Sequence, residues 1–131
     1  LLQVSRIDHG NRSLEDATLV VELVNRKMPL TVCPLSNHKL KVVKKMANHP
    51  LAEMLETGLM VTVNSDDPAY FGGYINDNYR VVSHALHLTR EQITTLAKNS
   101  FEASFLGREE KIRLIQSVDN YYLESSQVAR I

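Results

Sequence analysis

Cysteine is nearly absent from the sequence, and its charges cancel. Cys33 is the one cysteine, so the chain cannot form an internal disulfide, and this usage is typical of a reducing compartment. The 15 basic and 15 acidic residues give a formal net charge of zero. This balance argues against nucleic acid or an acidic membrane surface as a partner held by bulk charge. We therefore expect a cytoplasmic protein.

Long apolar runs and repeats are also missing. No stretch approaches the ~20 residues needed to span a bilayer, and no solenoid repeat or low-complexity segment is visible. The chain has 131 residues, 44% of them hydrophobic, which is enough to bury one core. The chain begins with Leu1 rather than Met and opens directly into an apolar segment. We therefore expect residues 1–131 to be a single domain segment whose N-terminal neighbour is absent.

Three short apolar segments predict β-strands, at residues 1–7, 30–33 and 60–64. Ser13 is a plausible N-cap for a helix over 14–26, and Thr89 with Gln92 forms a capping-box pattern. Further helices are predicted within 39–48, from Pro50 to Gly58, and over 79–86, 93–101 and 112–122, with a loop at 35–38. Strands alternating with helices predict an α/β fold with a parallel sheet.

Each predicted strand runs into a polar, turn-forming cluster. The clusters are residues 8–10, 34–37 and 64–68. In parallel α/β folds the functional side chains gather at the carboxyl ends of the strands. We therefore expect the three clusters to converge on one face of the molecule.

The third cluster contains two adjacent carboxylates, Asp66 and Asp67, followed by Pro68. Proline cannot continue a sheet ladder, so the carboxylates lie where the strand gives way to a loop. Like charges held side by side repel, and a bound cation or a shared proton would relieve that repulsion. The alternative is an ordinary solvated turn, because Asp is common in turns.

His9 and Cys33 are the other candidates at strand ends. His9 stands beside Gly10, and a catalytic role and an ordinary packed or surface role are equally open for it. Cys33 is a candidate nucleophile with His9 or His38 as its base. A cysteine inside an apolar strand is more often a small core residue, and we favour that interpretation.

The remaining polar and aromatic residues give weaker signals. The histidines other than His9 show no clear metal-ligand spacing, and the lysines that follow the second strand are typical of a solvated face, with a phosphate site as the alternative. Three aromatic residues after the carboxylates either anchor the loop or wall a pocket for a flat ring. The histidines are His38, His49, His84 and His87, and the lysines are Lys39, Lys41, Lys44 and Lys45. The aromatic residues are Tyr70, Phe71 and Tyr74.

Taken together, three segments resemble the adenosine/adenine deaminase family. They are residues 6–10 (RIDHG), 31–37 (TVCPLSN) and 63–74 (VNSDDPAYFGGY). They occur in the family's order, and the resemblance extends from residue 4 to about residue 106. Ser65 before the paired carboxylates and the aromatic segment 70–74 resemble the adenine deaminase branch.

The resemblance implies a (β/α)8 TIM barrel, of which this chain is the last three strand-helix units, and one zinc ion at the carboxyl ends of the strands. By similarity Asp66 is the carboxylate ligand of zinc, and Asp67 hydrogen-bonds the purine ring. His9 contacts the zinc-held water and steadies the developing oxyanion. The implied reaction is hydrolysis of adenine to hypoxanthine and ammonia in purine salvage.

The chain also departs from the family pattern. The family's His-x-His pair, its third histidine ligand and its general-acid glutamate have no counterpart here, and all of them belong to earlier strands. We therefore expect the missing N-terminal part of the barrel to be the chain's partner and the segment alone to be inactive. The alternatives are deamination of adenosine or another 6-aminopurine, and a non-catalytic α/β module.

Overall fold

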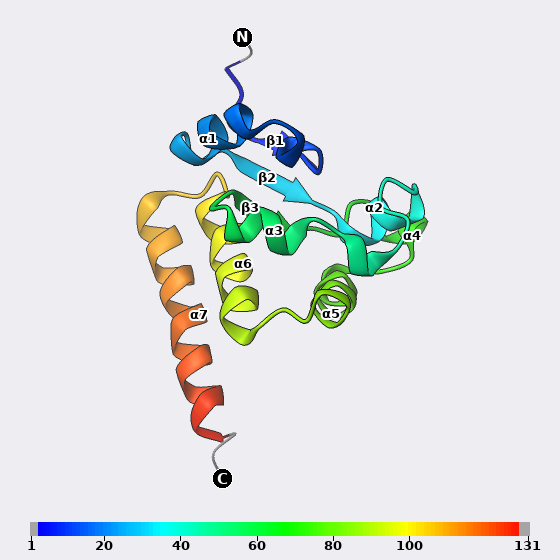
Figure 1. Cartoon of the computed structure of the whole chain (residues 1–131). Coiled ribbons are helices and arrows are strands. Elements are labelled where there is room, and N and C mark those ends of the chain that lie inside the picture. Colours follow the sequence, from blue (N-terminus) through cyan, green and yellow to red (C-terminus); the bar gives the residue numbers. More distant parts are fainter. Residues whose placement is uncertain (1–2, 129–131) are drawn as a thin grey trace.

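The computed structural model describes residues 3–128, with a three-stranded sheet and a series of helices (Figure 1). The elements, in chain order, are β1 (Ile7–Asp8), η1 (Ser13–Glu15), α1 (Ala17–Asn25), β2 (Pro29–Val32), α2 (Pro34–Lys39), η2 (Met46–Asn48), α3 (Leu51–Glu56), β3 (Met60–Val63), α4 (Pro68–Phe71), α5 (Ile75–Leu86), α6 (Arg90–Glu102) and α7 (Arg108–Val128). None of the described helices is long and apolar enough to cross a membrane.

The sheet is parallel and has the order β1-β2-β3. Leu30 of β2 pairs with Ile7 on one side and with Val61 on the other. One residue further along, Thr31 pairs with Asp8 and with Thr62. Because all the strands point the same way, their carboxyl ends lie at one edge of the sheet. The prediction of an α/β fold with three consecutive parallel strands is confirmed.

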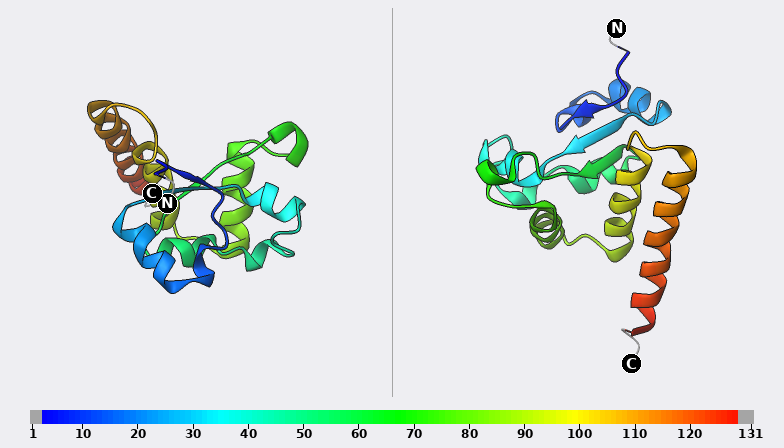
Figure 2. Two further views of the ribbon diagram at one scale, coloured as in Figure 1. Left: turned by 90° about the horizontal axis from the view of Figure 1, so that it is seen from above. Right: turned by 180° about the vertical axis from the view of Figure 1, so that it is seen from behind.

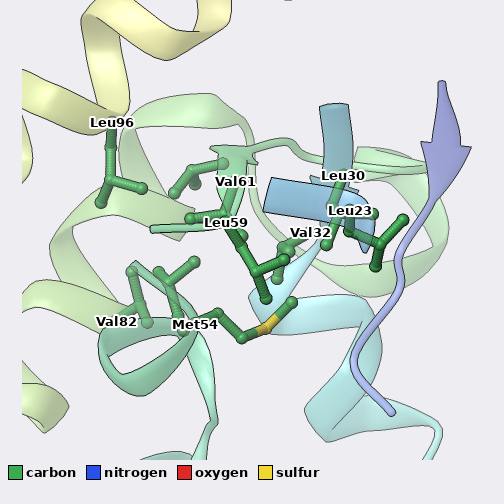
Figure 3. Packing of buried hydrophobic residues seen from close by; sticks show 10 residues of the cluster. Leu23, Leu30, Val32, Met54, Leu59, Val61, Val82 and Leu96 are labelled. Carbon is green, nitrogen blue, oxygen red and sulfur yellow. The ribbon is translucent and has the colours of Figure 1, made fainter. Parts of the chain in front are cut away.

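The two faces of the sheet differ in chemistry. Apolar residues of β2 and β3 alternate with Thr31 and Thr62, since successive strand side chains point to opposite faces. The apolar side chains join one buried core with residues from α1, α3, α5 and α6 (Figure 3). Its members are Leu23, Leu30, Val32, Leu51, Met54, Leu59, Val61, Val63, Val82 and Leu96. Helices α3, α5 and α6 contact β3, and α7 packs outside α6 (Figure 2).

The first strand is shorter than the sequence pattern predicts. We expected residues 1–7, whereas β1 comprises only Ile7 and Asp8; residues 1–2 lie outside the described part. Only these two residues pair with β2, and Val4 is 44% exposed. Within the described residues 3–6 the loose apolar alternation therefore does not form a strand, because β2 begins at Pro29 and its pairing with β1 begins at Ile7.

Three local predictions in the first half of the chain are wrong. Ser13 lies inside the 3-10 turn η1, and the N-cap of α1 is Asp16, which accepts the amide hydrogens of Thr18 and Leu19. Residues 35–38 form α2 rather than a loop, because Pro34 suits the first turn of a helix. Most of 39–48 is turns and bends, with η2 at its end.

The later helices follow the predictions closely. The helix after Pro50 ends before Gly58, whose backbone is left-handed. Thr89 and Gln92 cap α6 reciprocally: Thr89 Oγ1 accepts the Gln92 amide, and the Gln92 side chain accepts the Thr89 amide. Helices α5 and α6 both contact β3.

Candidate active site

His9, Cys33 and Asp66 meet at the carboxyl ends of β1, β2 and β3. Each offers one ligand atom, and these atoms all lie within 4.8 Å of one another. His9 Nε2 is 3.9 Å from Asp66 Oδ2, and the side chains are 43% and 31% exposed. The predicted convergence of the strand-end clusters is therefore confirmed for His9 and Asp66, and Cys33, the last residue of the predicted second strand, lies beside them.

Left-handed backbone turns carry two of these side chains. His9 has φ 61° and Asp66 has φ 57°, a conformation uncommon outside glycine but enriched in His and Asp. His9 directly follows β1, and Asp66 lies three residues beyond the end of β3, so both side chains are outside the in-and-out alternation of the sheet. Gly10 follows at φ 75°, where a Cβ would meet Leu30 Cδ2 at 2.9 Å. The chain therefore needs glycine beside His9.

A hollow of about 320 Å³ lies beside the His9–Asp66 pair. It is lined on the polar side of the sheet by Arg6, Asp8, His9, Thr31, Cys33, Asn64 and Asp66. Thr31 Oγ1 donates to Asp8 Oδ1 at 3.0 Å, and Asn64 Nδ2 donates to Thr62 Oγ1 at 2.8 Å. These bonds between neighbouring polar side chains hold the wall of the hollow in place.

Cys33 contributes a protonated thiol to this wall. Burial first, then the nearby carboxylates of Asp66 and Asp8, raise the pKa of Cys33 to about 12. Its Sγ donates to Thr31 O at 3.3 Å. A thiol held in this way is a poor nucleophile, and Cys33 is 5% exposed, which supports the interpretation of Cys33 as a small core residue.

The donor set fits a metal ion only in part. An Asp66 carboxylate oxygen faces the hollow beside His9, and carboxylate oxygen and imidazole nitrogen are both normal zinc ligands. Zinc requires further protein ligands for a catalytic site. Within residues 3–128, His9, Cys33 and Asp66 form the one cluster of this kind. The residues present therefore supply part of the ligand set of a metal site, and the other ligands would have to come from outside residues 3–128.

Asp67 is placed differently from its neighbour. Its side chain accepts the amide hydrogen of Tyr70 at 3.2 Å and caps the four-residue helix α4. Asp67 is exposed and is not among the residues that line the hollow. The structure therefore separates the two carboxylates, with Asp66 turned toward His9 and Asp67 at the start of α4.

Behind His9 lies a buried polar chain that the sequence reasoning missed. Asn37 Nδ2 is 3.4 Å from His9 Nδ1, and Asn37 Oδ1 is 3.1 Å from His49 Nε2. Asn37 and His49 are each 3% exposed. Asn37 is part of the segment 31–37, whereas His49 lies outside all three segments that resemble the family. The one sequence feature that points to His49 is its place just before Pro50 and the first turn of α3, where a side chain can accept a free helix amide.

The other candidates lie away from the hollow. His38, His84 and His87 are exposed, and His87 ends α5. All four lysines of the 39–45 run are exposed, as a solvated surface would be. Tyr70 packs edge-on against Phe71 with ring centroids 4.9 Å apart, and Tyr70 and Tyr74 are 67% and 71% exposed. None of these residues lines the hollow next to Asp66.

Parallel strand-helix units whose polar side chains gather at the carboxyl ends of the strands are typical of (β/α)8 barrels and other parallel α/β folds. The chain belongs to the adenosine deaminase family, whose sequence model matches residues 1–121.

Curated relatives are similar over most of the chain. An adenine deaminase from Hahella chejuensis is 57% identical over 121 residues, which are 92% of this chain and 36% of the relative. One from Sphingopyxis alaskensis is 59% identical over the same shares. The chain therefore spans about a third of the length of these relatives.

Solved structures share the fold. The adenine deaminase from Arthrobacter aurescens superposes with a TM-score of 0.89 at 50% identity, covering 92% of this chain and 37% of that one. A zinc-bound amidohydrolase from Burkholderia ambifaria gives a TM-score of 0.85 at 18% identity, covering 98% of this chain and 36% of that one. At that identity the second match speaks for the fold alone. The three strand-helix units are thus part of a TIM barrel.

Proposed function

We propose that this chain is the C-terminal part of a zinc-dependent adenine deaminase, which hydrolyses adenine to hypoxanthine and ammonia in purine salvage. The observation that carries the proposal is the meeting of His9 and Asp66 at 3.9 Å across the carboxyl ends of β1 and β3. The identity of more than 50% to curated adenine deaminases supports the substrate. The remaining zinc ligands and the general acid come from the preceding part of the barrel.

Asp66 is proposed as the carboxylate ligand of one zinc ion. Its left-handed backbone turns the side chain toward the hollow that His9 and Cys33 share. A bound zinc ion supplies a hydroxide nucleophile near neutral pH by lowering the pKa of its water. The role of this chain is to orient: the strand ends hold Asp66 and His9 side by side at the wall of the same hollow.

His9 is proposed to stabilise the oxyanion that develops as water adds to C6 of the purine. Its ring faces Asp66 through Nε2 and is held from behind through Nδ1. A preorganised donor aimed at developing charge is worth most in a site from which water is excluded. The polar wall formed by Asp8, Thr31 and Asn64 surrounds this position.

Asp67 is proposed to recognise the purine. One carboxylate oxygen caps α4, and the other is assigned to the substrate. Free adenine can carry its imidazole proton on N7, and the carboxylate accepts a hydrogen bond from that tautomer. Adenosine cannot offer the N7–H tautomer, because its ribose occupies N9. The carboxylate therefore favours the free base.

Substrate preference tests the proposal in the complete protein that contains this chain. We expect kcat/KM for adenine to exceed that for adenosine by at least ten-fold, the ratio that loss of one hydrogen bond of about 1.4 kcal/mol would give. The measurement is steady-state ammonia release from each substrate at matched zinc content. Equal or better turnover of adenosine would favour the adenosine alternative. No turnover of either, by zinc-loaded protein, would favour a non-catalytic module.

A further inference from the structure

The donors and acceptors of the hydrogen bonds behind His9 can be assigned by starting from a backbone N–H, which always donates. The amide N–H of Leu51, the first residue of α3, lies 3.1 Å from His49 Nδ1. The first amides of a helix have no partner within the helix, and an amide N–H can only donate. His49 Nδ1 therefore carries a lone pair and no proton.

The ring of His49 is neutral, so its proton is on the other nitrogen. His49 is 3% exposed, and burial lowers its pKa to about 4. A neutral imidazole with Nδ1 unprotonated carries its proton on Nε2. Nε2 lies 3.1 Å from Asn37 Oδ1, so His49 donates a hydrogen bond to Asn37.

This bond determines which way the Asn37 amide faces. Its oxygen is turned to His49 and also lies 2.8 Å from the Asn11 amide nitrogen. Its nitrogen is therefore turned the other way and lies 3.4 Å from His9 Nδ1. An amide nitrogen only donates, so His9 Nδ1 is the acceptor. With Nδ1 as the acceptor, the ring proton of His9 is on Nε2, the atom that faces Asp66 Oδ2.

We propose that Asn37 and His49 are positioning residues that hold His9 as the Nε2–H tautomer, with that N–H aimed at the reacting centre. This inference rests on the proposed function, and it specifies the role of His9 as a hydrogen-bond donor rather than a base. The two residues act through His9 and do not line the hollow themselves. Partners that orient a catalytic imidazole in this way set its tautomer and ring angle.

Two substitutions of His49 separate positioning from a purely structural role. An asparagine amide reaches about as far as imidazole Nδ1, and a glutamine amide about as far as Nε2. His49→Asn keeps an acceptor for the Leu51 amide and loses the donor to Asn37. His49→Gln keeps the donor to Asn37 and loses the acceptor for Leu51. If His49 serves only to cap α3, His49→Asn should behave like wild type and His49→Gln should not. If His49 positions His9, His49→Gln should behave like wild type and His49→Asn should not.

The primary measurement is the nitrogen NMR spectrum of histidine-labelled complete protein, with His9 assigned by its loss in His9→Asn. We expect the protonated ring nitrogen of His9 to be Nε2 in wild type and in His49→Gln, and the two tautomers to mix in His49→Asn. In the same proteins we expect kcat for adenine to fall about 10- to 100-fold in His49→Asn, with KM and zinc content unchanged. His49→Gln should stay within a few-fold of wild type.

The matched control is His38→Gln, on the same stretch of chain. His38 is exposed, and its Nδ1 lies 3.1 Å from Val43 O, away from the His9 chain; the variant should leave the His9 spectrum and kcat unchanged. A wild-type His9 protonated on Nδ1, or a harmless His49→Asn beside a damaging His49→Gln, would overturn the inference. The wild-type spectrum decides even when a variant does not fold. A protein that shows the Nε2–H tautomer but deaminates no adenine contradicts the proposed function and supports the positioning.

Discussion

The two faces of the sheet differ in what they carry: one is packed with apolar side chains, and the other holds the polar residues of the candidate site. On one face, Leu30, Val32, Val61 and Val63 are at most 2% exposed and pack against helices. On the other, polar side chains hydrogen-bond to one another and lead to the His9–Asp66 pair, which stays partly exposed. Because strand side chains alternate, a change on one face need not disturb the other. The predictions below test that separation in the complete protein.

The largest effect is expected at Asp66. Asp66→Ala should lose tightly bound zinc and with it adenine deamination, because it removes the proposed carboxylate ligand. Elemental analysis of the purified variant and a steady-state assay measure both losses. Thermal unfolding should show that the variant is still folded, since Asp66 is outside the apolar core. A variant that retains stoichiometric zinc contradicts the assignment.

Asp67→Ala is expected to keep its zinc. We expect kcat/KM for adenine to fall by more than the ~10-fold that loss of one neutral hydrogen bond would cause, because the lost acceptor is a carboxylate. The same substitution removes the cap of α4, at a cost of about 1 kcal/mol. Asp67→Ser separates the two effects, because serine caps well but offers no carboxylate. Recovery of activity in Asp67→Ser would mean that Asp67 acts only through α4, and loss of zinc in Asp67→Ala would reverse the two assignments.

On the apolar face, Leu96→Ala should lower the free energy of unfolding by about 2–5 kcal/mol, because it empties a fully buried site between α6 and the strands. The folded variant should keep the wild-type KM and zinc content. Urea unfolding followed by circular dichroism gives the loss. Thr95→Ala, at an exposed position one residue earlier on α6, is the control and should change stability by no more than ~0.5 kcal/mol. A raised KM in Leu96→Ala would show that the faces are coupled.

His49 lies at the border of the two regions, buried but polar, and should make folding sensitive to acid. Its folded pKa of about 4 lies below the ordinary value of 6.5, so below pH 6.5 the unfolded chain binds a proton that the folded chain does not. The contribution is fully present above pH 6.5 and is lost as pH falls toward 4. Between pH 7 and pH 5 the loss is about 2 kcal/mol. Urea midpoints at both values in wild type and His49→Gln measure it, and an unchanged pH dependence in the variant would contradict it.

Much of the fold and part of the site follow from the sequence pattern. Strand β3, helix α6 with its capping box, and the break at Gly58 agree with it because each depends on local spacing or a local cap. The pattern failed at residues 35–38 and 39–48. Polar residues there are compatible with helix or turn, and Pro34 and contacts with other elements decide between them.

By itself the sequence determined the alternation of strands and helices, the polar clusters at the strand ends and the likeness of Asp66, Asp67 and His9 to a deaminase site. The tertiary structure decided which of these side chains meet. It brought His9 to Asp66, left Asp67 at the start of α4, and joined His9 to a histidine that no pattern had singled out. The physical reason is that hydrophobic periodicity reports only local geometry. The direction of a side chain at a left-handed turn, and the hydrogen-bond partner of a buried amide, depend on groups that folding brings from distant parts of the chain.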